Sequence, residues 1–164
     1  MATPFQHTQR QALWLALILP ASLLGGAYLS QYGFGLYPCE MCWWQRWPHF
    51  AALALALAAF VLPANMLGVR KLLVALAGLG ILASGLIGAF HAGVEYHWWE
   101  GITACALPAA GGGNALDVIM AQPIIRCDQA PWRLAGISLA GFNALFSIGG
   151  ALTIFMLLAR GRKA

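Results

Sequence analysis

The sequence predicts an all-α membrane protein built as a four-transmembrane-helix bundle. Its 164 residues are 61% hydrophobic and only 9% charged, a balance that a soluble globule of this size does not tolerate. Four apolar stretches are each long enough to cross a hydrocarbon core of about 30 Å as a helix. The stretches lack the period-two alternation of barrel strands, so their backbone hydrogen bonds must form within helices. We expect one membrane domain with helices at 11–31, 43–62, 71–92 and 133–158.

The first stretch, 11–31, has some features of a secretory signal. Arg10 precedes it, and the small residues Gly25, Gly26 and Ala27 lie towards its end. However, the apolar core of a signal runs for about 7 to 15 residues, and this stretch continues well beyond that length. We therefore expect an uncleaved first helix, which also makes the number of helices even.

The few charged residues divide between the two ends of the predicted helices. All five acidic residues fall in the loops at 32–42 and 93–132. The positive-inside rule places both termini and the turn at 63–70 in the cytoplasm and these two loops outside. The net charge of +4 is therefore a signal of topology, and no basic cluster with interleaved aromatics indicates nucleic-acid binding. The basic residues of the cytoplasmic side are Arg10, Arg70, Lys71, Arg160, Arg162 and Lys163.

The start of the second helix carries two closely spaced cysteines. Cys39 and Cys42 follow Pro38 and precede the apolar run. A Cys-x-x-Cys disulfide closes too short a loop to stabilise the fold much, and its usual role is thiol–disulfide exchange. In the first turn of a helix, unpaired amides and the helix macrodipole favour the thiolate. The sequence therefore predicts a redox-active dithiol at the membrane surface.

Arg46 lies one helical turn after Cys42 and would stand over the same face of the helix. It would either snorkel to the lipid headgroups or act in the chemistry. In the second case, it would stabilise a thiolate and donate hydrogen bonds to an electron acceptor that gains negative charge. We favour this second role.

The dithiol needs an electron acceptor, and the sequence excludes several. It has no Gly-x-Gly-x-x-Gly and no P-loop motif for a nucleotide, and Trp43 replaces the histidine of a Cys-x-x-Cys-His haem site. A lipid-soluble quinone is the acceptor most available at this depth. Trp44 and Trp47, with Trp43, would either line a quinone site or belong to the interfacial aromatic belt.

The remaining two cysteines, Cys105 and Cys127, lie in the loop at 93–132. All four cysteines are thus on the predicted outer face, and disulfides persist where the outer compartment is oxidising. Pairing Cys105 with Cys127 is natural, although four cysteines allow three connectivities and the sequence does not choose among them. The loop pair would either staple the loop or exchange disulfides, and the glycine run 111–113 between the two cysteines favours movement.

Taken together, these motifs resemble the DsbB family of disulfide bond formation proteins. The resemblance covers essentially the whole chain and rests on three segments. It implies a four-helix protein dithiol:quinone oxidoreductase of the bacterial inner membrane, which serves electron transport and periplasmic protein folding. Its partners would be a DsbA-like periplasmic oxidase, ubiquinone or menaquinone, and membrane lipid. The segments are Pro38-Cys39-x-x-Cys42 with Gln45-Arg46, the loop pair Cys105 and Cys127, and Pro131-Trp132 with Gly136-Ile137-Ser138.

The resemblance also implies a role for each cysteine. Cys105 would form the mixed disulfide with the partner, and Cys127 would resolve it or pass electrons inward. Cys39 would accept the attack from the loop pair. Cys42, nearest Arg46, would contact the quinone.

His91 and Glu95, near the end of the third helix, also look like family features. They would either border the quinone or form a solvated helix end, because residues at this spacing are common at interfaces. We assign Gln45 no role.

Three other hypotheses fit parts of the pattern. A vitamin K epoxide reductase-like enzyme also joins loop cysteines to a four-helix quinone site, but its loop pair precedes the Cys-x-x-Cys. A membrane scaffold with two structural disulfides would have inert cysteines. A metal site of four thiolates would persist poorly in an oxidising compartment, so no metal is expected.

Overall fold

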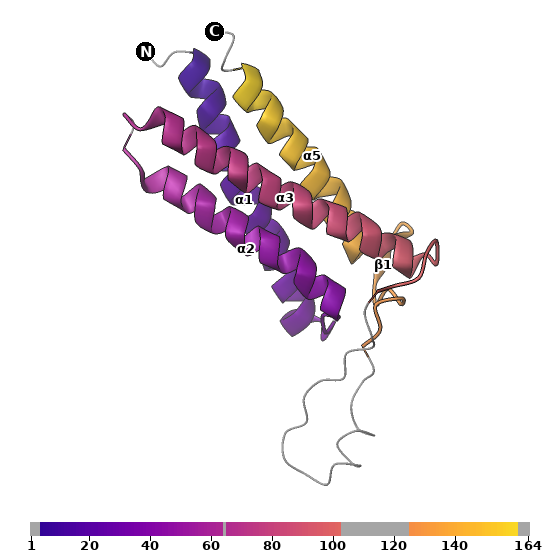
Figure 1. Cartoon of the computed structure of the whole chain (residues 1–164). Helices are drawn as coiled ribbons and strands as arrows, with labels where there is room; N and C mark the ends of the chain where they lie inside the picture. The colour runs from indigo at the N-terminus through magenta and orange to yellow at the C-terminus, as the bar shows by residue number, and fades with distance from the viewer. Residues whose placement is uncertain (1–3, 64, 103–124, 161–164) are drawn as a thin grey trace.

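The computed structural model describes residues 4–63, 65–102 and 125–160, and Cys105 and the glycine run 111–113 lie outside this part of the chain. The described residues form long helices and one short antiparallel hairpin (Figure 1). The elements are α1 (Pro4–Gly33), α2 (Glu40–Val61), α3 (Leu67–Glu95), β1 (Arg133–Leu134), β2 (Ile137–Ser138) and α5 (Leu139–Arg160).

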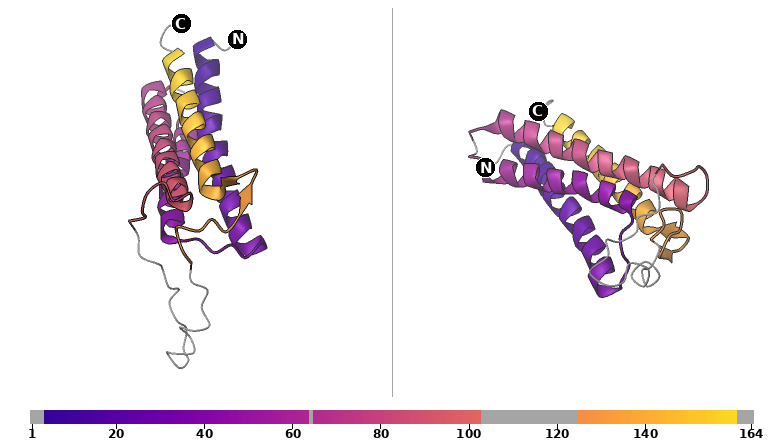
Figure 2. Two further views of the ribbon diagram at one scale, coloured as in Figure 1. Left: turned by 90° about the vertical axis from the view of Figure 1, so that its right-hand side faces the viewer. Right: turned by 60° about the horizontal axis from the view of Figure 1, so that its bottom comes forward.

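The helices lie side by side and alternate in direction along the bundle (Figures 1 and 2). α3 packs against α2 and α5, and α1 packs against α5 and α2. The two termini and the turn between α2 and α3 lie at one end, whereas the α1–α2 connection and the hairpin lie at the other (Figure 1). The start of α2, with its cysteines, is therefore at the end opposite the termini.

Three of these helices are long and apolar enough to cross a membrane: His7–Gly33, Leu67–Glu95 and Leu139–Arg160. α2 forms a helix of 22 residues but is not among them. Its first half carries Gln45, Arg46 and His49, which lower its mean hydropathy. The chain is therefore an all-helical membrane protein in its described main elements, and the crossing by α2 stays a prediction.

The centre of the bundle is built from small residues. Seven alanines distributed over the four long helices are completely buried. At Gly85 of α3, an added Cβ would lie 2.9 Å from Cβ of Ser147 and 3.0 Å from the backbone nitrogen of Ile148 on α5. Because no side chain fits there, glycine allows the two helices to approach closely. The alanines are Ala12, Ala16, Ala52, Ala56, Ala59, Ala77 and Ala151.

The last helix begins at Leu139, not at 133 as the sequence predicted. The preceding residues form the hairpin, in which Ala135 and Gly136 connect the strands with φ of 50° and 81°. Two successive positive φ angles are typical of the tight turns that join antiparallel strands. α1 and α3 extend beyond the predicted apolar stretches at both ends, because a helix can continue past the hydrocarbon core with polar residues. α2 starts three residues before its predicted stretch and ends one residue earlier.

Candidate redox site

The two cysteines of the Cys-x-x-Cys motif face each other in the first turn of α2. Cys39 is the N-cap residue, and its Sγ accepts a hydrogen bond from the backbone N–H of Cys42 at 3.3 Å. The two sulfur atoms are 2.9 Å apart, and neither is in a disulfide. The predicted position of the dithiol at the start of the helix is therefore confirmed.

Cys127 lies beside Cys39. The Sγ atoms of Cys39 and Cys127 and a ring nitrogen of His91 are all within 4.8 Å of one another, and all three residues are buried. Hydrogen bonds with Cys127 and Cys42, together with burial, raise the pKa of the Cys39 thiol far above its ordinary value. The structure thus brings one loop cysteine to the first cysteine of the motif.

His91 contacts this cluster through a defined tautomer. The Nε2 group of Gln45 donates hydrogen bonds to the carbonyl oxygen of Met41 at 3.1 Å and to His91 Nδ1 at 2.8 Å. Because an amide N–H can only donate, Nδ1 carries no proton and Nε2 does. His91 Nε2 donates to the carbonyl oxygen of Cys127 at 3.2 Å and lies 3.5 Å from Cys39 Sγ.

Glu95 is also part of this buried cluster. Its Oε1 lies 3.8 Å from His91 Nε2, and its Oε2 has no hydrogen-bond partner among the described residues. The side chains of His91 and Glu95 are only 2% and 3% exposed. The solvated helix end considered for this pair is therefore wrong, because the segment that carries Cys127 covers the end of α3.

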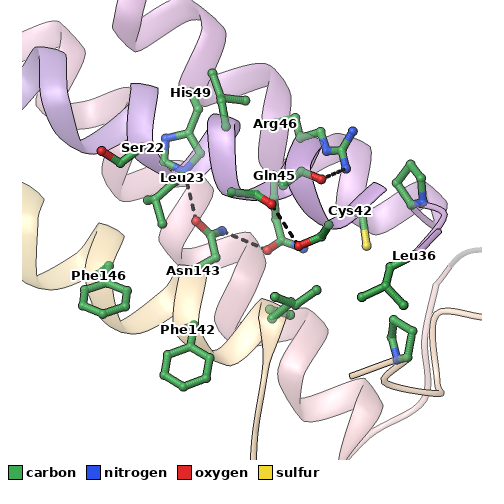
Figure 3. Close-up of a pocket in the computed structure, with 18 of the residues that line it drawn as sticks. Ser22, Leu23, Leu36, Cys42, Gln45, Arg46, His49, Phe142, Asn143 and Phe146 are labelled. Atoms are coloured by element: carbon green, nitrogen blue, oxygen red, sulfur yellow. Dashed lines mark hydrogen bonds between the residues drawn. The ribbon is translucent and has the colours of Figure 1, made fainter. Parts of the chain in front are cut away.

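An apolar cavity of about 260 Å³ opens beside Cys42, between α1, α2 and α5 (Figure 3). Along α2 it is lined by Cys42, Gln45, Arg46 and His49. These residues lie at positions i, i+3, i+4 and i+7, so they share one face of the helix. The rest of the wall is mostly apolar and includes Phe146 of α5. We call this space the apolar cavity.

Arg46 is fixed at the wall of the apolar cavity. Its guanidinium donates hydrogen bonds to Oε1 of Gln31 at 2.7 Å and to the carbonyl oxygen of Ala27 at 3.3 Å, both on α1. It also lies over the rings of Tyr28 and Trp43, at 5.0 and 4.9 Å. With 6% exposure, Arg46 does not snorkel to the surface.

None of the three tryptophans lines the apolar cavity. Trp43 contacts Arg46, whereas Trp47 is 64% exposed on the outside of the bundle. An exposed tryptophan near a helix end is typical of the interfacial belt.

A second cavity, of about 280 Å³, lies on the other side of the dithiol. Cys39, His91 and Glu95 line this cavity and not the apolar cavity, whereas Cys42 lines both. We call it the thiol cavity. In the structure, His91 and Glu95 therefore lie with Cys39, while Cys42 lies with Arg46.

A polar network that the sequence did not predict connects α2, α3 and α5. Asn143 Nδ2 donates to Oε1 of Gln45 at 2.8 Å and to the carbonyl oxygen of Ser84 at 3.2 Å. Its Oδ1 accepts a hydrogen bond from Nε2 of His49 at 2.9 Å (Figure 3). Gln45 was assigned no role from the sequence. The helical spacing of Gln45 and His49 after Cys42 was the available signal.

Comparison with known proteins gives the chain a family. Residues 9–157 match the model of the family "Disulfide bond formation protein DsbB". The chain belongs to the DsbB family. Three relatives of this DsbB family member are named disulfide bond formation protein B. They come from Marinobacter nauticus (28% identity, 93% of this chain and 94% of the relative), Polaromonas sp. (30%, 96% and 95%) and Chromohalobacter salexigens (32%, 87% and 76%). No solved structure matches.

Proposed function

We propose that this DsbB family member is a protein dithiol:quinone oxidoreductase of the bacterial inner membrane. It reoxidises a DsbA-like periplasmic oxidase and passes the two electrons to ubiquinone or menaquinone. The observation that carries the proposal is the position of Cys42 between two different environments. On one side is the thiol cavity with Cys39, and on the other is the apolar cavity with the fixed cation of Arg46.

The proposed relay begins at the loop pair. A thiolate of the partner attacks Cys105 of a Cys105–Cys127 disulfide, which releases Cys127. Cys127 then attacks Cys39 of a Cys39–Cys42 disulfide, so a Cys39–Cys127 bond forms and Cys42 leaves as a thiolate. The second thiol of the partner displaces Cys105, and Cys105 then displaces Cys39. The partner and the loop pair are now oxidised, and Cys39 and Cys42 hold two electrons and two protons.

The geometry supports the inward step of this relay. Cys127 lies against Cys39, so the sulfur that leaves is Cys42, which already lines the apolar cavity. His91 Nε2–H, 3.5 Å from Cys39 Sγ, is placed to stabilise negative charge on that sulfur during exchange. Glu95 lines the thiol cavity with Cys39 and Cys42, and its Oε2 has no hydrogen-bond partner among the described residues, so it would accept a thiol proton.

The residues around the apolar cavity fit a quinone. A quinone ring and tail require an apolar space, and the carbonyl oxygens require donors, since they gain negative charge on reduction. Arg46 and Cys42 would hold the ring, and a bound quinone supplies a two-electron acceptor. The guanidinium is already fixed by Gln31, so it stabilises developing charge without reorganising. The involvement of His91 and Glu95 would be indirect, through the cysteines.

The direct test is quinone reduction with purified protein in detergent. The protein is mixed with a reduced thioredoxin-like dithiol oxidase and ubiquinone-1, and quinone absorbance is followed. We expect reduction by the wild type and by a control variant at the exposed Trp47, Trp47→Phe, and none by Cys42→Ser. If neither ubiquinone nor menaquinone analogues were reduced and the cysteines stayed unreactive, the protein would instead be a membrane scaffold with two structural disulfides.

A further inference from the structure

A cavity at the opposite end of the bundle has no place in the redox chemistry. It measures about 290 Å³ and opens between α1, α3 and α5. The start of α1, the start of α3 and the end of α5 lie at the end of the bundle that holds both termini (Figure 1). Three cationic side chains line the cavity: Arg10 of α1 and Arg70 and Lys71 of α3. We call it the basic cavity. Its position is a full bundle length from the dithiol.

No carboxylate of the described residues lines the basic cavity. Like charges around one small space repel one another, and more strongly where the surroundings are apolar. A bound anion would relieve this repulsion.

Two further observations at the cavity wall indicate a site for an anion with several acceptor oxygens. The Nε group of Arg70 donates a hydrogen bond to the carbonyl oxygen of Ala59 at 3.1 Å, which fixes the guanidinium at the cavity wall. The Nε2 group of Gln9, which also lines the cavity, is buried and has no hydrogen-bond partner among the described residues. A buried donor without a partner is rare and calls for a ligand or ion.

The inner wall of the basic cavity is apolar. Leu13, Val74 and Leu158 line it and are each less than 10% exposed. A small inorganic anion would use only the charged side chains, whereas a phospholipid would use both parts of the site. Its phosphate would meet the cations, and its acyl chains would follow the apolar helices into the membrane. Basic pockets between transmembrane helices have this combination when they bind anionic headgroups.

We propose that the basic cavity binds the phosphate of an anionic phospholipid. Arg10, Arg70 and Lys71 neutralise the phosphodiester, and the Gln9 amide donates to one of its oxygens. A zwitterionic lipid carries its own cation and therefore competes poorly for this site. The proposal does not depend on the quinone relay, because none of these residues contacts the redox site.

The experiment uses the full-length protein in a neutral detergent, with lipid binding measured by native mass spectrometry. The protein is titrated with phosphatidylglycerol, with phosphatidylcholine and with inorganic phosphate. We expect tight retention of phosphatidylglycerol only, and a loss of about fivefold in affinity for each cation removed in Arg10→Gln and Lys71→Gln. Gln9→Leu, which keeps the charge, should also weaken retention.

Arg160→Gln is the matched control, because Arg160 lies at the same end of the bundle but does not line the cavity. It should leave affinity for phosphatidylglycerol within twofold of the wild type. An equal loss in Arg160→Gln would mean a diffuse surface charge effect and would overturn the proposal. Equal retention of phosphatidylcholine, or equally tight binding of inorganic phosphate, would also overturn it. Thermal unfolding of each variant without lipid separates loss of the site from loss of the fold.

Discussion

The side chain of Gln45 decides which nitrogen of His91 carries the proton. Its amide nitrogen must donate to the carbonyl oxygen of Met41, so the same group can only donate to His91 Nδ1. His91 then presents Nε2–H to Cys39 and Cys127, the pair that exchanges disulfides in the proposed relay. Gln45 is therefore a positioning residue that acts on the sulfurs through an imidazole.

Replacing Gln45 with leucine tests this arrangement. Gln45→Leu leaves His91 Nδ1 without its donor and removes the acceptor of Asn143, which should cost about 1–3 kcal/mol of stability. The proton of His91 is then no longer confined to Nε2. We expect ¹⁵N NMR of labelled histidine to show one tautomer of His91 in the wild type and a mixture in the variant. A single unchanged tautomer in a folded Gln45→Leu protein would contradict the assignment.

A second prediction for a single residue concerns the pH dependence of the reactivity of the Cys39 thiol. Its pKa is raised, so the thiolate forms only as the pH rises above the range of an ordinary thiol. In the reduced native protein, alkylation of Cys39 should therefore stay slow through that range and accelerate only at higher pH. Peptide mapping after iodoacetamide treatment measures the rate, and protein unfolded in detergent provides the ordinary profile. Matching profiles for the native and unfolded protein would contradict the prediction.

Among the elements, α2 shows which features of the fold and the site could be predicted from the sequence. The apolar stretches predicted its existence, and the spacing of Cys42 and Arg46 correctly predicted that both face one site. Helical spacing places Gln45 on the same face of α2 as Cys42, but the contact between Gln45 and Asn143 was not predictable. It depends on which faces of α2 and α5 meet, and helical periodicity within one segment does not contain that information. The start of α5 was misplaced because Ala135-Gly136 turns the chain before the helix begins.

The close contact between α3 and α5 predicts that a larger residue at Gly85 lowers the stability of the protein. Gly85→Ala would place Cβ 2.9 Å from Cβ of Ser147 and 3.0 Å from the backbone of Ile148, so the helices must separate. Overpacking of this kind costs about 1–3 kcal/mol. Gly149→Ala is the matched control, since nothing lies within 4 Å of its added Cβ. Thermal unfolding in detergent should show a lower midpoint for Gly85→Ala only, and equal midpoints would show that the contact can relax.

For the whole molecule, the arrangement of helices gives a reason to expect that α2 also crosses the membrane. α2 packs against both α1 and α3, and its connection to α3 lies at the end that holds both termini (Figure 1). If α1 and α3 span the bilayer, the chain must return through α2. Its polar side chains do not oppose this, because Gln45, Arg46 and His49 are buried within the bundle. Polar residues in transmembrane helices are tolerated when they face the interior.

This topology predicts opposite accessibility for the two ends of the bundle. In a background with all four cysteines changed to serine, single cysteines are placed at Glu100 and at Asn65, both exposed and at opposite ends. Because basic residues gather near Asn65, we expect that end in the cytoplasm. A membrane-impermeant maleimide should label Glu100→Cys in intact bacteria and label Asn65→Cys only after permeabilisation. The reverse pattern would place the dithiol in the reducing cytoplasm, and labelling of both sites in intact cells would mean that α2 does not cross.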